Sequence, residues 1–186
     1  MKIYIKYMVS LRYKRMVEDE MKKLGLKSIV LDLGIVEILE DITQEQREKL
    51  KENLGKAGLE LLDNSKSSLI EQIKNVITEM IHDTEELPKV NYSDYISEKL
   101  KYDYNYLSNL FSEVKGITIQ HYIITQKIEK VKELLFFNEL NLTEISYKLG
   151  YSSVAHLSSQ FKKITGLTPS FYKKLRQKRK GHTQNE

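Results

Sequence analysis

Two segments of the chain carry small and polar side chains at helical spacing. In the later segment these residues are Val154, Ala155, His156, Ser158 and Ser159. The earlier segment has Asn105, Ser108 and Asn109 at comparable places. A helix with such a face fits the major groove of DNA, where base edges offer hydrogen-bond donors and acceptors. For one segment alone, the competing interpretation is an ordinary solvated helix surface, and the recurrence weakens that interpretation.

Both segments lie inside an internal repeat that indicates two copies of one unit. The first copy, 96–122, reads ISEKLKY, four residues, LSNLF, four residues and GITIQHY; the second, 145–172, reads ISYKLGY, five residues, LSSQF, four residues and GLTPSFY. In the second copy Ile145 and Leu149 share one helix face, and Gly150 suits the left-handed conformation that ends a helix. A second apolar stripe follows after a short gap. Helix, tight turn and helix form the outline of a helix-turn-helix.

The stretch between the copies, 119–137, has apolar residues at helical intervals and is expected to form one connecting helix. Its 19 residues at about 1.5 Å each span roughly 28 Å. That length is close to the roughly 34 Å between successive major-groove faces on one side of DNA. One chain could therefore place both copies on one duplex. The tyrosines at 102, 104 and 106 either pack or contact phosphates, and core packing is favoured for Tyr102, which matches Tyr151 of the second copy.

Ahead of the repeat, the patterns predict a small sheet domain over 1–63 with the order β-α-β-β-α-β, which is that of a ferredoxin-like fold. Alternating and β-branched runs predict strands at 2–7, 28–33, 35–40 and 59–62. Apolar periodicity predicts a first helix that ends at Gly25. The capping-box pair Thr43 and Gln46 predicts a second helix that runs to Lys56.

A helix over 65–82, within a helix-and-linker segment at 64–91, carries a broad apolar stripe that needs a partner. The stripe either packs on the sheet or forms a two-helix seam in a homodimer, and the N-terminal domain is the other candidate surface for a homodimer. The acidic, proline-containing stretch 83–91 predicts a domain boundary. An all-α double helix-turn-helix domain is then expected over 92–178, followed by a basic and polar tail at 179–186.

Composition and charge limit the classes of function. The 186 residues include no cysteine, which excludes disulfides and thiolate metal sites. No run of about 18 apolar residues predicts a membrane span, and no secretory signal is recognised, so a cytoplasmic location is expected. Residues 145–186 hold 9 Lys and Arg against 1 Glu, whereas residues 83–144 hold 7 against 11 acidic residues. The second copy is therefore expected to bind phosphate, with candidate contacts at Lys162, Lys163, Lys173 and Lys174.

From Ile145 to Tyr172 the chain reads IxxKLGYSSxxHLSxxFKKxTGLTPSxY, which resembles the second helix-turn-helix signature of AraC/XylS-type bacterial transcription regulators. The resemblance covers about 92–176, and the diverged first copy strengthens it, because this family has two such units joined by one helix. It implies a regulator of transcription, not an enzyme, with double-stranded DNA as its partner. Ser159 and Asn109 stand where the family often has an arginine, so the bidentate guanine contact of arginine is absent there.

The N-terminal domain also resembles a family, the small heavy-metal-associated domains of metal chaperones and transporting ATPases. Their ligands follow the first strand in a pattern like M-x-C-x-x-C. Met8 is kept here, but Ser10 and Tyr13 occupy the cysteine places, so no metal and no other cofactor is expected. Two alternatives to the regulator stay open: a protein-interaction module with weakened DNA binding, and a metal-responsive module.

Overall fold

A computed structural model describes residues 1–83, 91–137 and 140–182. The chain divides into two compact units. The sheet unit combines residues 1–75 with 96–119, and the helical unit combines residues 76–95 with 120–186. Residues 96–119 of the first copy therefore share a unit with the N-terminal sheet, whereas the whole second copy lies in the helical unit. Most of the predicted domain boundary falls at 84–90, outside the described residues.

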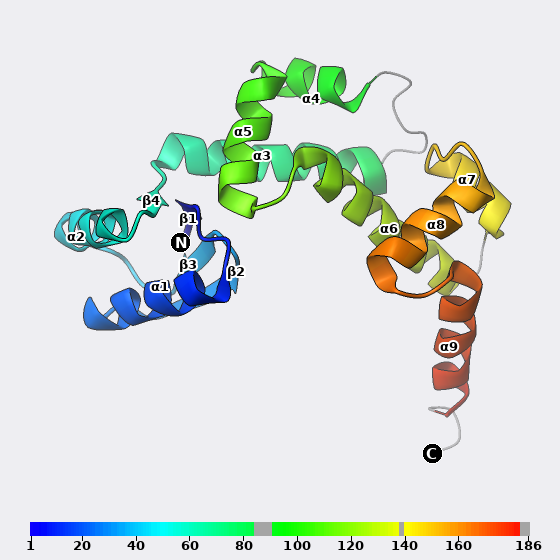
Figure 1. Ribbon diagram of the computed structural model, residues 1–186, viewed down its shortest axis with the longest axis horizontal. Coiled ribbons are helices and arrows are strands. Elements are labelled where there is room, and N and C mark those ends of the chain that lie inside the picture. The colour runs from blue at the N-terminus through cyan, green and yellow to red at the C-terminus, as the bar shows by residue number, and fades with distance from the viewer. Residues whose placement is uncertain (84–90, 138–139, 183–186) are drawn as a thin grey trace. The chain divides into compact units, whose positions relative to one another are not determined.

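The N-terminal part of the sheet unit is a four-stranded antiparallel sheet with two helices (Figure 1). Its elements are β1 (Lys2–Lys6), α1 (Leu11–Lys23), β2 (Ser28–Asp32), β3 (Ile35–Ile38), α2 (Gln44–Lys56) and β4 (Glu60–Leu61). These elements follow the order predicted from the sequence. The strands lie in the order β2-β3-β1-β4, so β1 occupies a central position and β2 forms one edge.

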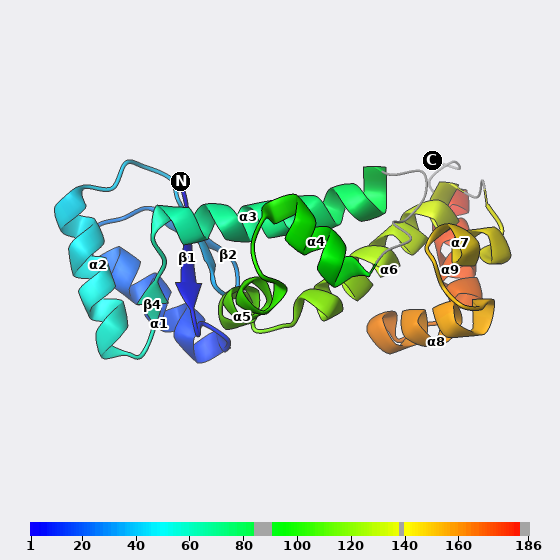
Figure 2. The ribbon, with the colours of Figure 1, turned by 90° about the horizontal axis from the view of Figure 1, so that it is seen from above.

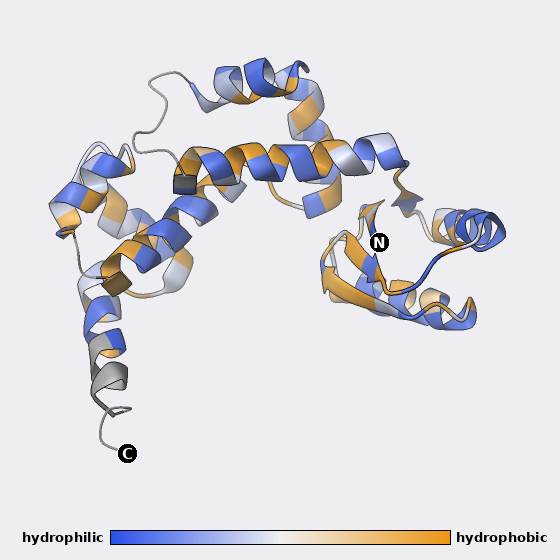
Figure 3. Ribbon diagram, turned by 180° about the vertical axis from the view of Figure 1, so that it is seen from behind, coloured by the Kyte–Doolittle hydropathy of each residue, from blue (hydrophilic) through white to orange (hydrophobic). Residues whose placement is uncertain are grey.

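Alternation along the strands builds the core of this sheet. Ile3 and Ile5 of β1 are at most 3% exposed, as are Val36 and Ile38 of β3. Because side chains two apart on a strand point to one face, these four share a face, which packs against buried residues of α1 and α2: Val17, Met21, Leu50 and Leu54. In Figure 3 β2 and β3 are largely coloured as hydrophobic and α2 largely as hydrophilic. Both helices thus cover the same side of the sheet.

Side-chain caps start α1 and α2. Ser10 Oγ accepts a hydrogen bond from the Tyr13 N–H at 3.4 Å, and the predicted capping box of Thr43 and Gln46 is confirmed by hydrogen bonds of 3.1 and 3.0 Å. Met8 is 0% exposed and belongs to the core. The loop that would hold metal ligands in the heavy-metal-associated family is therefore used here for packing and for capping a helix.

The opposite face of the sheet buries a tyrosine hydroxyl. Tyr4 of β1 is 1% exposed, and its hydroxyl has no hydrogen-bond partner among the described residues. A buried polar group without a partner costs about 1–3 kcal/mol.

We expect Tyr4→Phe to raise the free energy of unfolding by about 1 kcal/mol in urea titrations. Tyr102→Phe, at an exposed position, is the control, and a less stable Tyr4→Phe variant would contradict the prediction.

The helix expected over 65–82 is α-helical from Asn64 to Thr78 (α3) and continues as one π-helical turn, Glu79–Asp83. Its apolar stripe is buried within the single chain, at Leu69, Ile70, Ile73, Ile77, Met80 and Ile81. A two-helix seam in a homodimer would need this stripe at the surface. The homodimer stays a prediction.

The described elements of the repeat region are all helices. Its elements are α4 (Tyr92–Leu100), α5 (Tyr104–Lys115), α6 (Ile119–Phe137), α7 (Leu142–Lys148), α8 (Val154–Thr165) and α9 (Pro169–His182). The predicted connecting helix is confirmed as α6, with the expected bounds. Helix α9 extends to His182, so the first residues of the expected tail at 179–186 are helical. Among the described helices, none is long and apolar enough to cross a bilayer.

Candidate nucleic-acid interface

Local hydrogen bonds shape the second helix-turn-helix unit, which consists of α7 and α8 (Figure 2). Asn141 caps α7, and Glu144 closes a capping box with it. Gly150 then turns the chain with φ 63, which confirms the predicted turn. Ser153 Oγ accepts a hydrogen bond from the His156 N–H at 3.1 Å and thereby starts α8, the recognition helix of this unit.

One side of α8 is buried and the other is accessible. Leu157 and Phe161 are 0% exposed and join a core with residues of α6 and α7 and with the residue that ends α7: Ile128, Val131, Leu135, Ile145 and Leu149. Among the predicted base-contacting residues, Ala155, His156 and Ser159 are exposed, while Val154 and Ser158 are half-buried. The predicted phosphate contacts Lys162 and Lys163 are exposed in the last turns of the same helix. Helix α8 therefore brings these seven residues together, and their contact with DNA stays a prediction.

The first helix-turn-helix unit, α4 and α5, has the same local design. Asp103 caps α5 by accepting a hydrogen bond from the Asn105 N–H at 2.9 Å. Asn105 and Asn109 are exposed and Ser108 is half-buried. These three predicted contacts lie in the first two turns of α5, which is the recognition helix of the first unit.

The turn of the first unit departs from the second in two ways. Lys101 has φ 60 at the place of Gly150, a conformation that costs a residue with a β-carbon roughly 1–2 kcal/mol. The analogy with Tyr151 predicts that Tyr102 packs in the core, and this prediction is wrong. It is 47% exposed because it stacks at the surface on Tyr106, with ring centroids 5.8 Å apart.

Helix α9 supplies the remaining predicted phosphate contacts. Lys174 is exposed and Lys173 is half-buried. Together with Ser170 and Asn141 they line a hollow of about 320 Å³, and none of the described residues that line it is acidic. Two ammonium groups beside hydroxyl and amide groups suit a phosphate.

Comparison with known proteins agrees with this geometry. A family model described as a helix-turn-helix domain matches residues 96–175. This region is an AraC-type helix-turn-helix domain. The melibiose operon regulatory protein of Escherichia coli K12 is 31% identical over 85 residues, which are 46% of this chain and 28% of that protein. The chain therefore matches little more than a quarter of this curated relative.

Solved structures give the same fold for the AraC-type domain. The C-terminal domain of AraT, a response regulator from Geobacillus stearothermophilus, is 27% identical with a TM-score of 0.50, and the match covers 58% of this chain and 85% of that one. An AraC-type transcriptional regulator from Chromobacterium violaceum has a TM-score of 0.53 at 18% identity, covering 61% and 96% of the two chains. The second likeness concerns the fold alone.

A buried lysine lies beneath the second unit of the AraC-type domain. Lys127 of α6 is 7% exposed, and its Nζ lies 4.1 Å from the centroid of the Tyr151 ring and 5.9 Å from that of Tyr92. Both ring faces attract a cation. The Tyr151 hydroxyl donates a hydrogen bond to Gln160 Oε1 of α8 at 2.8 Å. Lys127 of α6 is therefore linked to α8 through Tyr151, the residue that follows the turn glycine. The sequence analysis does not identify Lys127.

The stability of the AraC-type domain should depend on pH through Lys127. Burial lowers the pKa of Lys127 to about 8 from 10.5. Between these values the unfolded chain holds a proton that the folded chain has released, so the free energy of unfolding rises with pH. The rise is at most about 1.4 kcal/mol per pH unit. Burial also raises the pKa of Tyr151, which has the opposite effect once unfolded tyrosines ionise near pH 10.

Urea unfolding from pH 8 to pH 9.5 measures this effect. The difference in unfolding free energy between the native chain and Lys127→Met is expected to grow in favour of the native chain as pH rises. Lys127→Arg, which stays charged over this range, should show no such rise. A constant difference between the native chain and Lys127→Met would show that Lys127 keeps an ordinary pKa.

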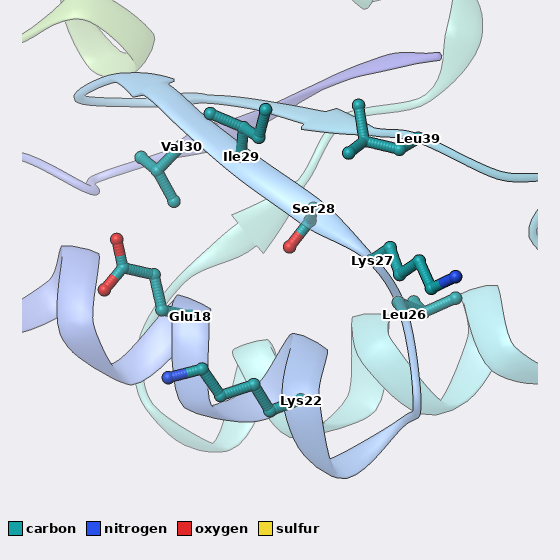
Figure 4. Close-up of a pocket in the computed structure, with 8 residues that line it drawn as sticks. All are labelled: Glu18, Lys22, Leu26, Lys27, Ser28, Ile29, Val30 and Leu39. Atoms are coloured by element: carbon teal, nitrogen blue, oxygen red, sulfur yellow. The ribbon is translucent and has the colours of Figure 1, made fainter.

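The sheet unit contains a separate open groove. Figure 4 shows Glu18 and Lys22 of α1 on one side of it and Ser28, Ile29 and Val30 of β2 on the other. Its volume is about 630 Å³, and charges of both signs line it. The predicted DNA contacts lie on α5, α8 and α9, so this groove is not part of the candidate interface.

Proposed function

We propose that this chain is a DNA-binding regulator of transcription that reads two adjacent major-groove segments with its two helix-turn-helix units. The observation that carries the proposal is that α5 and α8 both bury an apolar side and present small or polar residues on the other. The match of residues 96–175 to a helix-turn-helix family supports it. The similarity to a protein named as the regulator of the melibiose operon also supports the proposal.

In this proposal both helix-turn-helix units contact base edges, and the second unit contributes the phosphate contacts. Hydroxyl, amide and imidazole groups on α8 and α5 meet base edges, while the lysines of α8 and α9 bind phosphates and fix the register. Residues 145–186 carry a net charge of +8, from 9 basic residues and 1 acidic residue, so the second unit supplies most of the affinity. The 19 residues of α6 span roughly 28 Å, which suits two groove segments about one helical turn apart.

The proposal extends to the N-terminal domain. Its element order and its strand order β2-β3-β1-β4 support a ferredoxin-like fold. We propose the fold of the heavy-metal-associated domains without their metal site, because Met8 and Ser10 serve the core and the α1 cap. Within the described ranges, no three His, Asp or Glu side chains gather as metal ligands. A cytoplasmic location and the absence of enzymatic activity complete the proposal.

Selection of bound DNA from a random pool by the full chain, followed by nuclease protection at near-physiological salt, tests this function. We expect an enriched site with two protected segments about 10 base pairs apart. Ser159→Asp should abolish protection of one segment, because a carboxylate in the groove repels DNA. Ser65→Asp, the same change at an exposed serine of α3, should leave both segments protected. No enrichment by the native chain would refute the proposal.

A further inference from the structure

The end of β1 caps the last turn of α5. Tyr7 has a left-handed backbone conformation, with φ 65, and its N–H donates a hydrogen bond to the Glu113 carbonyl oxygen at 2.8 Å. The last four carbonyl groups of a helix lack partners within the helix. The Gly116 N–H donates to the Ser112 carbonyl oxygen at 2.9 Å. The next carbonyl group, that of Glu113, is satisfied by Tyr7, which belongs to the N-terminal sheet domain (residues 1–63). Figures 1 and 2 both show the end of β1 beside α5.

The turn between β2 and β3 approaches the same end of α5 more closely than a side chain allows. Gly34 has φ +75, and a Cβ placed on it would lie 2.0 Å from the Val114 carbonyl oxygen. Nearby, a Cβ on Gly116 would lie 3.1 Å from Val9 Cγ1. Two backbones therefore meet at Gly34, and only glycine permits that approach.

Ion pairs flank this contact. Lys6 Nζ lies 3.0 Å from Glu113 Oε2 and 3.4 Å from Glu60 Oε2, and its side chain is 12% exposed. Burial alone would lower the pKa of Lys6, but its hydrogen bonds and the two carboxylate charges raise it. The Lys115 side chain, 7% exposed, pairs with Asp32 at the end of β2. The two lysine side chains are largely removed from water, whereas their carboxylate partners are 37–60% exposed, so these pairs are only partly screened by solvent.

The two copies of the repeat differ at this end of the recognition helix. At an offset of 50 residues, Ser112 and Glu113 stand where the second copy has Lys162 and Lys163. Both lysines are exposed, whereas Glu113 is half-buried. The first copy therefore lacks the two candidate phosphate contacts, and its Glu113 contacts Lys6 and Tyr7 of the N-terminal sheet domain instead.

We propose that the N-terminal sheet domain holds the recognition helix of the first helix-turn-helix unit, with Lys6, Asp32 and Gly34 as positioning residues. The proposal rests on the DNA-binding function inferred above. The held end of α5 is its last turn, so Asn105 and Asn109 in the first two turns stay accessible. The first unit thus depends on the N-terminal domain, although its sequence belongs to the AraC-type domain. The second unit depends on the core that it shares with α6.

Gly34→Ala in the full chain tests the proposal, with Gly58→Ala as the matched control. The two glycines have φ +75 and +76, but a Cβ at Gly58 meets nothing within 4 Å. We expect Gly34→Ala to speed amide exchange in α5 and to remove protection of the DNA segment read by the first unit. The segment read by the second unit should stay protected. Gly58→Ala should keep both segments protected and α5 exchange slow.

Charge reversal provides a second test that does not depend on the turn. Lys115→Glu should weaken protection of the first segment, and Lys115→Glu combined with Asp32→Lys should restore it. Equal protection in Gly34→Ala and Gly58→Ala, or no rescue by the double reversal, would overturn the proposal. Amide exchange separates the two hypotheses. Fast exchange in α5 of Gly34→Ala supports the contact even if the native chain selects no DNA, a result that would refute only the function.

Discussion

Replacement of Lys162 and Lys163 together by glutamine is expected to weaken DNA binding to a similar extent for every sequence. Each ammonium group that neutralises a phosphate contributes about 0.9 to the slope of log affinity against log salt. The slope should therefore fall by about 2. Both lysines are exposed in the last turns of α8, so their loss should leave the fold and the base preference unchanged.

Titrations at several salt concentrations with the selected site and with an unrelated duplex measure this slope. The matched control is Lys49→Gln with Lys51→Gln, which removes the same charge from the exposed side of α2. An unchanged slope in the α8 variant would mean that these lysines do not contact phosphate. An equal loss in the control would mean that net charge, rather than position, determines the affinity.

Features that depend on neighbours in sequence could be predicted well. The capping box at Thr43 follows from two residues three apart, and the turn at Gly150 follows from one glycine after an apolar pair. The bounds of α6 follow from uninterrupted periodicity between two copies of the repeat. Each of these features is decided by local hydrogen bonds or by backbone freedom, so the chain nearby is sufficient to specify it.

Features that depend on contacts between distant segments were missed. Lys127 lies four residues from Ile123 and from Val131, a place in the apolar stripe that could have indicated its burial. Tyr102 was misplaced because the analogy with Tyr151 ignored a surface partner for its ring. The role of Gly34 could not be predicted, since it arises from the approach of α5, far along the chain. The exchange of Lys163 for Glu113 between the copies was the one available signal of that contact.

Phe161→Ala is expected to destabilise the helical unit strongly and to leave the sheet unit folded. The Phe161 side chain is 0% exposed and meets the Tyr172 ring edge-to-face, with centroids 5.5 Å apart. Removal of a buried phenylalanine side chain costs about 3–5 kcal/mol, a large part of the 5–15 kcal/mol that stabilises a typical domain. Its neighbours form a core of α6, α7 and α8, so the loss should open the helical unit and remove one protected DNA segment.

Phe111→Ala is the matched change in the first copy, because Phe111 is also 0% exposed and lies in the sheet unit. Native-state amide exchange distinguishes the two variants. Phe161→Ala should speed exchange in α7 and α8 while the strands β1 and β3 stay protected, and Phe111→Ala should speed exchange in α5. Loss of protection in the strands of Phe161→Ala would mean that the two units unfold together. In that case neither helix-turn-helix unit could be loosened alone, because one cooperative transition would link the sheet to both recognition helices.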